Sequence, residues 1–214
     1  MEQKKTKIAV LVSGGGTNLG ALIAAERNGI IKSGTISLVI SNKAGAYALE
    51  RAREAGIEAI TVTKAECGSQ EAFENRLIEE LRSHGIELIV LAGFMSILSE
   101  RFTSLFRDRI INVHPSLIPS FCGKGYYGLR VHEAALEKGV KLSGATVHIV
   151  TPECDAGPIV LQRAVEVRED DTPETLQRRI MEEAEWKILP EAVRLFCEDR
   201  ITVENGRVRI SKGE

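Results

Sequence analysis

Cysteine is scarce in this sequence, and no two cysteines form a C-x-x-C pair. The charged N-terminus is not followed by an apolar segment with a small-residue cleavage site, so we expect no signal peptide. In a chain without an export signal, scattered cysteines are expected to be free thiols in a reducing cytoplasm. The four positions are Cys67, Cys122, Cys154 and Cys197.

Other absences exclude whole classes of protein. No apolar run approaches the length that crosses a membrane. The formal net charge is only −2 and the isoelectric point is near 6.2, so no strong overall field indicates nucleic acid or an anionic membrane as a partner. No three histidines or cysteines share the spacing of metal ligands, so we expect no metal. We therefore expect a cytoplasmic protein that acts on small molecules, as a monomer or a homodimer.

The 214 residues are 43% hydrophobic and 27% charged, which is typical of one globular domain with a real core. Short apolar runs alternate with helical segments, and this pattern predicts right-handed βαβ units around a parallel sheet. The expected strands cover residues 8–12, 36–41, 57–62, 86–92, 110–114, 145–150 and 159–167. The expected helices cover about 18–29, 45–55, 70–84 and 131–138, with a long one from Thr172-Pro173 to about Cys197 that bends before Pro190.

Two short runs joined through Asn205-Gly206, at residues 201–203 and 207–210, predict a C-terminal hairpin. The fold class is therefore α/β: a single Rossmann-like open twisted sheet, mostly parallel, with helices on both faces and a small C-terminal hairpin. One domain is expected to span residues 1–214.

A glycine-rich turn, Ser13-Gly14-Gly15-Gly16-Thr17-Asn18, lies between the first strand and the first helix. Glycines let the backbone approach an anion, and the start of a helix offers free N–H groups. A tight turn without a ligand is the plain alternative, but three glycines followed by two polar residues favour a phosphate.

The phosphate need not belong to a dinucleotide. Leu19 stands where the third glycine of G-x-G-x-x-G would be, and the second strand ends in Ser41-Asn42-Lys43 without an acidic residue for a ribose. The sequence also lacks the G-x-x-x-x-G-K-[ST] motif of P-loop NTPases. These departures predict a phosphorylated small substrate, and they weigh against an NAD-dependent oxidoreductase.

Asn112 and His114 form a polar pair on an otherwise apolar strand, an arrangement whose burial cost packing alone would not recover. Two residues apart, their side chains leave the same face, and Pro115 ends the strand. Ligands bind at the carboxyl ends of strands in such sheets. Asp155, between two strand-like runs, is the candidate carboxylate.

The other histidines have plainer expected roles. His148 is expected to be a hydrogen-bonded core histidine, and its position close to Asp155 makes it a secondary candidate for the site. His84, at a helix end, is expected to be a solvated cation. His132, at a helix start, is expected to be solvated, with a contact that closes the neighbouring loop as the alternative. The glycines and aromatics of residues 120–128 predict a mobile loop beside the site.

The three side chains suit attack on a carbonyl. An amide and an imidazolium can stabilise an oxyanion, and a nearby aspartate would favour the charged imidazole and relay a proton. No serine or cysteine is placed as an obvious covalent nucleophile, so direct transfer of an acyl-level carbon is expected.

The chain resembles the phosphoribosylglycinamide formyltransferase family over nearly its whole length. The resemblance implies transfer of the formyl group of 10-formyltetrahydrofolate to the amine of glycinamide ribonucleotide in de novo purine biosynthesis, by direct attack through a tetrahedral intermediate. The motifs that carry it are Ser13-Gly14-Gly15-Gly16-Thr17-Asn18-Leu19, Leu91-Ala92-Gly93-Phe94-Met95, Asn112-Val113-His114-Pro115-Ser116-Leu117 and Asp155-Ala156-Gly157-Pro158.

The family's site residues can be carried over by position. The resemblance implies Asn112, His114 and Asp155 as catalytic residues. Glu185, five residues before Pro190, would approach the substrate amine. The glycine turn would bind the substrate phosphate through Gly15, Gly16, Thr17 and Asn18. The folate would contact Met95, Ser96, Ile97, Leu98, Asn112 and Gln70.

The implied division is a phosphate-binding half, about 1–100, and a folate-binding and catalytic half, about 101–214. Ser96 and Gln70 stand where relatives carry arginine, which affects the contacts to the folate tail.

Formyltetrahydrofolate deformylase and methionyl-tRNA formyltransferase share this core. The first usually adds an N-terminal regulatory domain and the second a C-terminal tRNA-binding domain. The alternative that is not an enzyme is a nucleotide-binding sensor with the same fold and no turnover.

Overall fold

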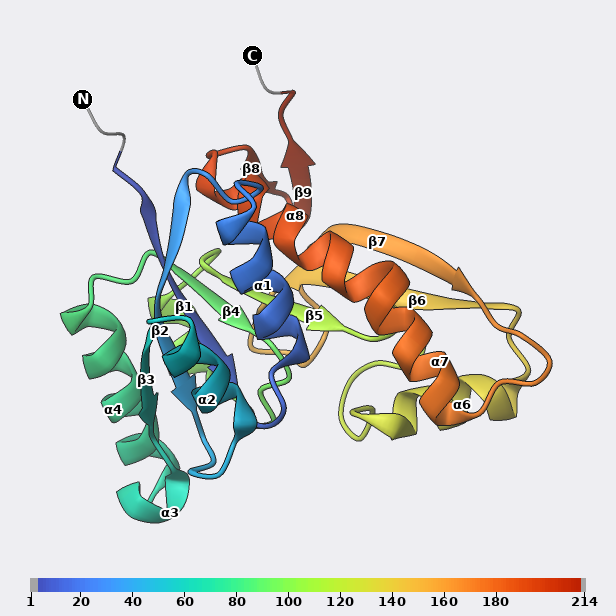
Figure 1. The fold of residues 1–214 in the computed structure, drawn as a ribbon, viewed down its shortest axis with the longest axis horizontal. Helices are drawn as coiled ribbons and strands as arrows, with labels where there is room; N and C mark the ends of the chain where they lie inside the picture. Colours follow the sequence, from blue (N-terminus) through green and yellow to red (C-terminus); the bar gives the residue numbers. More distant parts are fainter. Residues whose placement is uncertain (1–3, 213–214) are drawn as a thin grey trace.

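The computed structural model describes residues 4–212, in which seven strands form one twisted sheet in the order β3-β2-β1-β4-β5-β6-β7 (Figure 1). Neighbouring strands from β3 to β5 are parallel, while β6 runs antiparallel to both β5 and β7. The prediction of a mostly parallel sheet is confirmed. The strands are β1 Thr6–Val12, β2 Gly34–Ser41, β3 Glu58–Thr61, β4 Leu88–Leu91, β5 Ile110–His114, β6 Leu142–Ile149 and β7 Ile159–Glu166.

Helices cover both faces, as expected. One apolar cluster joins the sheet to α1, α2 and the C-terminal helices, and a second cluster on the other face joins it to α4 and α5. The alternation within β1 explains why its apolar run is continuous: Ile8 and Val10 face the first cluster, while Ala9 and Leu11 face the second. The helices are α1 Thr17–Arg27, α2 Tyr47–Glu54, α3 Lys64–Cys67, α4 Gln70–Ser83, α5 Glu100–Leu105, α6 Leu129–Lys138, α7 Pro173–Ile180 and α8 Trp186–Cys197.

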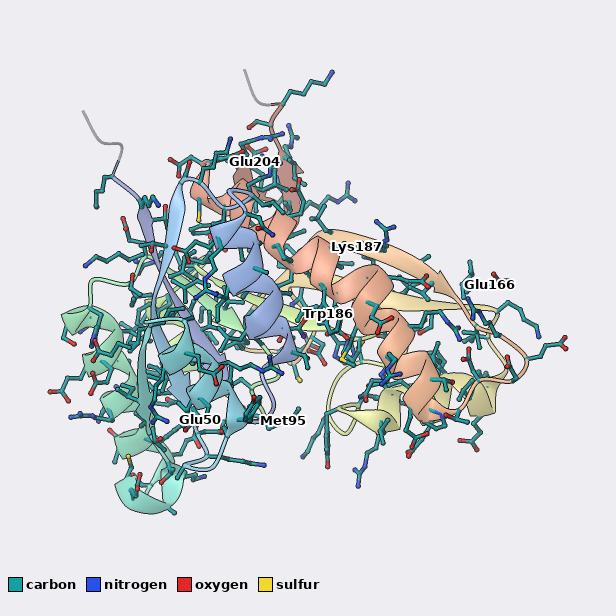
Figure 2. All side chains as sticks on the ribbon, in the orientation of Figure 1. Glu50, Met95, Glu166, Trp186, Lys187 and Glu204 are labelled. Carbon is teal, nitrogen blue, oxygen red and sulfur yellow. The ribbon has the colours of Figure 1, made fainter. Side chains whose placement is uncertain are left out.

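The long C-terminal helix is irregular earlier than the sequence predicted. A π-helical segment, η1 (Met181–Glu185), joins α7 to α8, and the N–H of Trp186 reaches the Met181 carbonyl five residues before it. Figure 2 shows Trp186 and Lys187 where the helix continues into α8. A π segment adds a residue to the turn and therefore changes which side chains face inward. Here it buries the carboxylate-bearing side chain of Glu185.

Two short helices, α3 and α5, were not expected, whereas the C-terminal hairpin is confirmed. It consists of β8 (Ile201–Glu204) and β9 (Arg207–Ile210), and both turn residues have positive φ, 51° at Asn205 and 72° at Gly206, as a two-residue hairpin turn requires. No helix in the described range is both long and apolar enough to cross a membrane.

The strand order places the glycine turn in the crevice of the sheet. The chain leaves β1 toward β2 on one side and later adds β4 on the other, so the order reverses beside β1. The loops after β1 and β4 meet there, because the Met95 N–H donates to Ser13 Oγ at 2.8 Å. Ligands of open α/β sheets bind at this kind of reversal point.

Candidate active site

The carboxyl end of β5 and the neighbouring strand β6 bring a polar group together. Ile111 and Val113 face the cluster that includes α1, so Asn112 and His114 face the other side of the sheet. The antiparallel register places His148 directly opposite Asn112. The Asn112 amide Nδ2 lies 3.2 Å from His148 Nε2.

Asp155 reaches the same place from the loop between β6 and β7. Its Oδ2 lies 3.6 Å from His114 Nδ1, and its Oδ1 lies 3.6 Å from His148 Nε2. Oδ2 also accepts a hydrogen bond from the Gly123 N–H at 2.9 Å. Burial alone would raise the pKa of Asp155, but the contact with His148, the proximity of His114 and the Gly123 N–H together lower it to about 2. The carboxyl is therefore ionised at neutral pH.

The loop that carries Asp155 approaches β6 too closely for a side chain at Gly157. A Cβ there would lie 1.8 Å from the Ile149 carbonyl oxygen. The Ile149 N–H in turn donates to the Pro158 carbonyl at 2.9 Å. Asp155 itself has a φ of 54°, in the left-handed region that aspartate tolerates better than most residues. The tight turn thus fixes where the carboxylate points.

The favoured charge state of His114 differs from the prediction. Its Nε2 donates to the Phe121 carbonyl at 2.9 Å, while Nδ1 faces Asp155. Burial lowers the pKa of His114, and the Phe121 carbonyl and Asp155 offset this only in part. The sequence predicted an imidazolium held charged by the aspartate. In the structure the neutral form is favoured, because desolvation of the ring outweighs the nearby carboxylate.

The expectation for His132 was wrong, since its ring is completely buried. Neither of its nitrogens has a hydrogen-bond partner in the part of the chain that the structure describes, and burial lowers its pKa to about 4, with His114 adding to the effect. His148 is both buried and hydrogen-bonded, with Nδ1 at 2.9 Å from the Ile149 carbonyl. His84 caps the end of α4, where Nδ1 lies 2.7 Å from the Glu80 carbonyl.

The glycine turn opens α1 without a side-chain cap. Gly16 has a φ of 69°, and a Cβ there would lie 2.6 Å from the Ala48 Cβ, so the turn accepts only glycine at this position. The first N–H groups of α1 point out of the helix end, as those of any helix do. An open pocket of about 470 Å³ lies beside the turn. It is lined by Ser13, Gly14, Gly15, Lys43, Gly45, Ala46 and Tyr47.

Glu185 faces the start of α1 from η1. Its Oε2 accepts a hydrogen bond from the Asn18 amide at 2.6 Å, and the residue is only 6% exposed. Burial raises the pKa of Glu185 to about 7, although the Asn18 amide acts in the opposite direction. Asn18 Oδ1 is buried without a hydrogen-bond partner among residues 4–212. Thr17 Oγ1 lies nearby, 3.7 Å from Met181 Sδ.

The segment proposed for folate follows β4 and is partly open to solvent. Met95 and Ile97 are 51% and 67% exposed, whereas Leu98 is buried. Figure 2 labels Met95 near the end to which β1 and β2 point. Ser96 Oγ accepts a hydrogen bond from the Asn42 amide at 2.7 Å.

Gln70 contacts this segment but has no free amide hydrogen. Its Nε2 donates to Glu74 Oε1 at 2.8 Å and to the Ile97 carbonyl at 3.0 Å. The structure therefore places Gln70 against the backbone of the folate segment.

Two contributors to the site escaped sequence reasoning, namely the Phe121 carbonyl and the Gly123 N–H. Both are backbone groups, so no residue type signals them; the only hint is the glycine content of the loop that carries them. Tyr126 and Tyr127 of this loop are exposed. Between residues 4 and 212 no three histidine, cysteine, aspartate or glutamate side chains are grouped as metal ligands would be.

Comparison with known proteins shows the family of this chain. Residues 6–193 match the family model described as formyl transferase. The phosphoribosylglycinamide formyltransferase of Escherichia coli is 42% identical over 194 residues, which are 91% of this chain and 88% of that protein. The trifunctional purine biosynthetic protein adenosine-3 of Gallus gallus is 42% identical over 209 residues, and there the matched part is only 20% of the relative.

A solved structure is similar as well. The crystal structure of glycinamide ribonucleotide transformylase 1 from Symbiobacterium toebii has a TM-score of 0.91 and 47% sequence identity, covering 97% of this chain and 95% of that one. The similarity therefore extends over nearly the whole length of both chains.

Proposed function

The chain belongs to the formyl transferase family, and from this premise we propose that it transfers the formyl group of 10-formyltetrahydrofolate to the amine of glycinamide ribonucleotide, a step of de novo purine biosynthesis. The proposal depends on one observation above all. The Asp155 carboxylate lies 3.6 Å from His114 and 3.6 Å from His148, and the Asn112 amide lies against His148 at the end of β5. These side chains can stabilise a tetrahedral intermediate and assist its breakdown.

The two substrates approach from opposite sides of that group. The phosphate of the ribonucleotide binds the N–H groups of the turn at Gly15, Gly16, Thr17 and Asn18. Its amine lies toward Glu185, whose burial between η1 and α1 places a carboxyl at the start of the same helix. The folate lies along residues 95–98, which Gln70 supports from α4. Residues up to about 100 thus hold the phosphate, and the later half supplies the catalytic groups.

Bond formation begins when the amine attacks the formyl carbon. The carbonyl oxygen becomes an oxyanion, and the Asn112 amide donates to it. Among residues 4–212 only His148 contacts the amide nitrogen, which leaves its second hydrogen for this purpose. A donor fixed before the reaction stabilises the developing charge without reorganisation.

One proton must then move for the reaction to balance. The attacking nitrogen loses a proton as the new C–N bond forms, and N10 of the folate gains one as its bond to the formyl carbon breaks. His114 Nδ1, which faces Asp155, accepts the proton and passes it on, directly or through water. The ionised Asp155 stabilises the imidazolium while it lasts.

The experiment follows conversion of 10-formyltetrahydrofolate to tetrahydrofolate by the purified protein with and without glycinamide ribonucleotide. We expect turnover only when the ribonucleotide is present, with formylated ribonucleotide as the second product. Turnover that releases formate without the ribonucleotide identifies a deformylase. Absence of turnover in both cases, with ribonucleotide binding retained, identifies a sensor. Either result overturns the proposal.

A cytoplasmic location and a monomeric or homodimeric state complete the proposal. Sedimentation of the purified protein over a range of concentrations measures the oligomeric state. A single species larger than a dimer would contradict it.

A further inference from the structure

Helix α2 holds the glycine turn from behind. The Ala48 N–H donates to the Gly14 carbonyl at 3.0 Å, and the Arg51 side chain donates from Nε to the Gly15 carbonyl at 2.9 Å. Two successive carbonyls of the turn are therefore bound to one helix. The second of these bonds is made by a side chain, so a substitution can remove it.

The position of each carbonyl determines the direction of the next N–H. In a trans peptide the C=O and N–H of one unit point in opposite directions. Because the carbonyls of Gly14 and Gly15 point toward α2, the N–H groups of Gly15 and Gly16 point away from it. Neither N–H donates to another group in the described range. Together with the free N–H groups at the start of α1, they form a concave set of donors that suits an anion.

Gly14 and Gly15 carry no side chain that could hold this part of the turn in place. A Cβ placed on Gly14 or Gly15 would have no neighbour within 4 Å, so the side of each residue that would carry a side chain faces open space. Glycine without packing samples many backbone conformations, and the donors would lose their common direction. Arg51, by contrast, is held in place. Its guanidinium lies 4.9 Å from the ring centre of Tyr47, and its Cδ lies 3.6 Å from the position of a Cβ on Gly16.

We propose that Arg51 is a positioning residue for the substrate phosphate: it fixes the Gly15–Gly16 peptide so that the Gly16 N–H faces the anion. The identity of the substrate rests on the function proposed above, whereas the role of Arg51 in binding phosphate can be measured without it. Arg51 acts through the backbone of the turn and takes no part in the transfer of the formyl group.

Three variants test the proposal kinetically. Arg51→Met removes the donor but keeps an unbranched stem next to Tyr47, and Arg51→Lys restores a donor and the charge. Arg53→Met is the matched control, because Arg53 is on the same helix, exposed, and paired with Glu50 at 2.6 Å. We expect Arg51→Met to raise KM for the ribonucleotide at least about tenfold, as loss of a hydrogen bond from a charged donor does. The kcat and the KM for the folate should stay within about twofold of wild type.

The conservative variant and the control complete the kinetic comparison. Arg51→Lys should recover most of the loss, and Arg53→Met should behave as wild type. An unchanged KM for the ribonucleotide in Arg51→Met, or an equal rise in both KM values, overturns the proposal. If Arg51→Met does not fold, Arg51→Ala takes its place in both the kinetic and the NMR comparison.

The salt dependence of KM distinguishes a positioning role of Arg51 from simple electrostatic attraction of the phosphate. An exposed charge is largely screened at about 0.5 M salt, whereas the direction of a peptide is not. The ratio of KM values between Arg51→Met and wild type should therefore persist at high salt. A ratio that falls to one shows that Arg51 only attracts the phosphate, and it overturns the proposal.

Amide NMR gives a readout that does not require turnover. Titration of the wild type with inorganic phosphate should shift the Gly16 amide resonance, and Arg51→Met should lose most of this shift, whereas Arg53→Met keeps it. Failure of the formyl-transfer assay with a normal Gly16 shift counts against the proposed function alone. A Gly16 resonance that does not respond to phosphate in the wild type counts against the role of Arg51.

Discussion

Replacement of Glu185 by glutamine should make the folded protein more stable at pH 8 relative to wild type, while leaving the two proteins much closer at pH 5. Glu185 is 6% exposed, and burial raises its pKa from 4.5 to about 7. Above that pH the folded state must hold a carboxylate with little solvent and one amide donor, whereas the unfolded chain solvates it fully. Glutamine has nearly the same shape and no charge.

The sign and size follow from proton linkage. A carboxyl whose pKa is higher in the folded state binds its proton more tightly there, so protonation contributes stability. That contribution is complete below pH 4.5 and is lost as the pH rises to about 7. At about 1.4 kcal/mol per pKa unit the whole loss is roughly 3 kcal/mol, and the part between pH 5 and 8 is roughly 2 to 3 kcal/mol.

Urea denaturation of wild type and Glu185→Gln at several pH values between 5 and 8 measures this difference. All other titrating groups are common to both proteins and cancel in the comparison. Glu182→Gln is the control, because Glu182 belongs to the same π segment and is exposed. The free energy of unfolding of Glu185→Gln, relative to wild type, should rise with pH across this range. A difference that stays constant within about 0.5 kcal/mol would refute the linkage between burial and charge.

Such a group weakens the fold at neutral pH, and its retention at the start of α1 is therefore consistent with a functional use. Stabilising substitutions often reduce activity where function depends on a strained or destabilised active site. Glu185→Gln should follow this pattern and lose activity while it gains stability.

Three further changes test other parts of the site. Asp155→Asn should lower kcat by roughly 100- to 1000-fold in a protein that still folds, because the charge that stabilises a protonated His114 is removed; near-normal turnover would disprove its catalytic role. Gln70→Ala should raise KM for the folate roughly tenfold through loss of its two hydrogen bonds, with KM for the ribonucleotide unchanged; an equal rise in both would show a general loosening of the fold. Gly157→Ala should lower the free energy of unfolding by roughly 3 kcal/mol or more, because its Cβ would lie 1.8 Å from the Ile149 oxygen; a denaturation midpoint equal to wild type would contradict the close approach.

The sequence predicted best those elements whose hydrophobic pattern follows from which faces of the sheet are buried. β5 has the predicted bounds because Pro115 must end it, and the run within β1 is apolar throughout because both faces of the sheet are covered. The two helices that were not expected, α3 and α5, have four and six residues and are too short for hydrophobic periodicity to show. Their only sequence signals are the caps, Thr63 and Ser99, whose side chains accept the N–H three residues later.

The site was predictable where it depends on strand alternation and not where it depends on packing between distant segments. Asn112 and His114 had to share a face of β5. His132 was expected in solvent, yet it is completely buried among residues that come together only in the fold. The charge of His114 was missed for the same reason. A nearby aspartate can be predicted from a motif, but the loss of solvent around the ring depends on the whole tertiary structure.

The lowered pKa of His114 changes the part that this residue can play. Both histidines of the site are oriented by backbone carbonyls: His148 Nδ1 lies 2.9 Å from the Ile149 carbonyl, and His114 Nε2 lies 2.9 Å from the Phe121 carbonyl. The remaining nitrogen of each ring therefore faces the side chains of the site. A ring that was always charged could hold an oxyanion but could not accept the proton that the amine must lose. A neutral His114 beside an ionised Asp155 can accept that proton, and burial makes it release the proton again to the leaving nitrogen. The geometry therefore fits His114 as a proton carrier better than as a permanent cation, and it leaves stabilisation of the oxyanion mainly to Asn112.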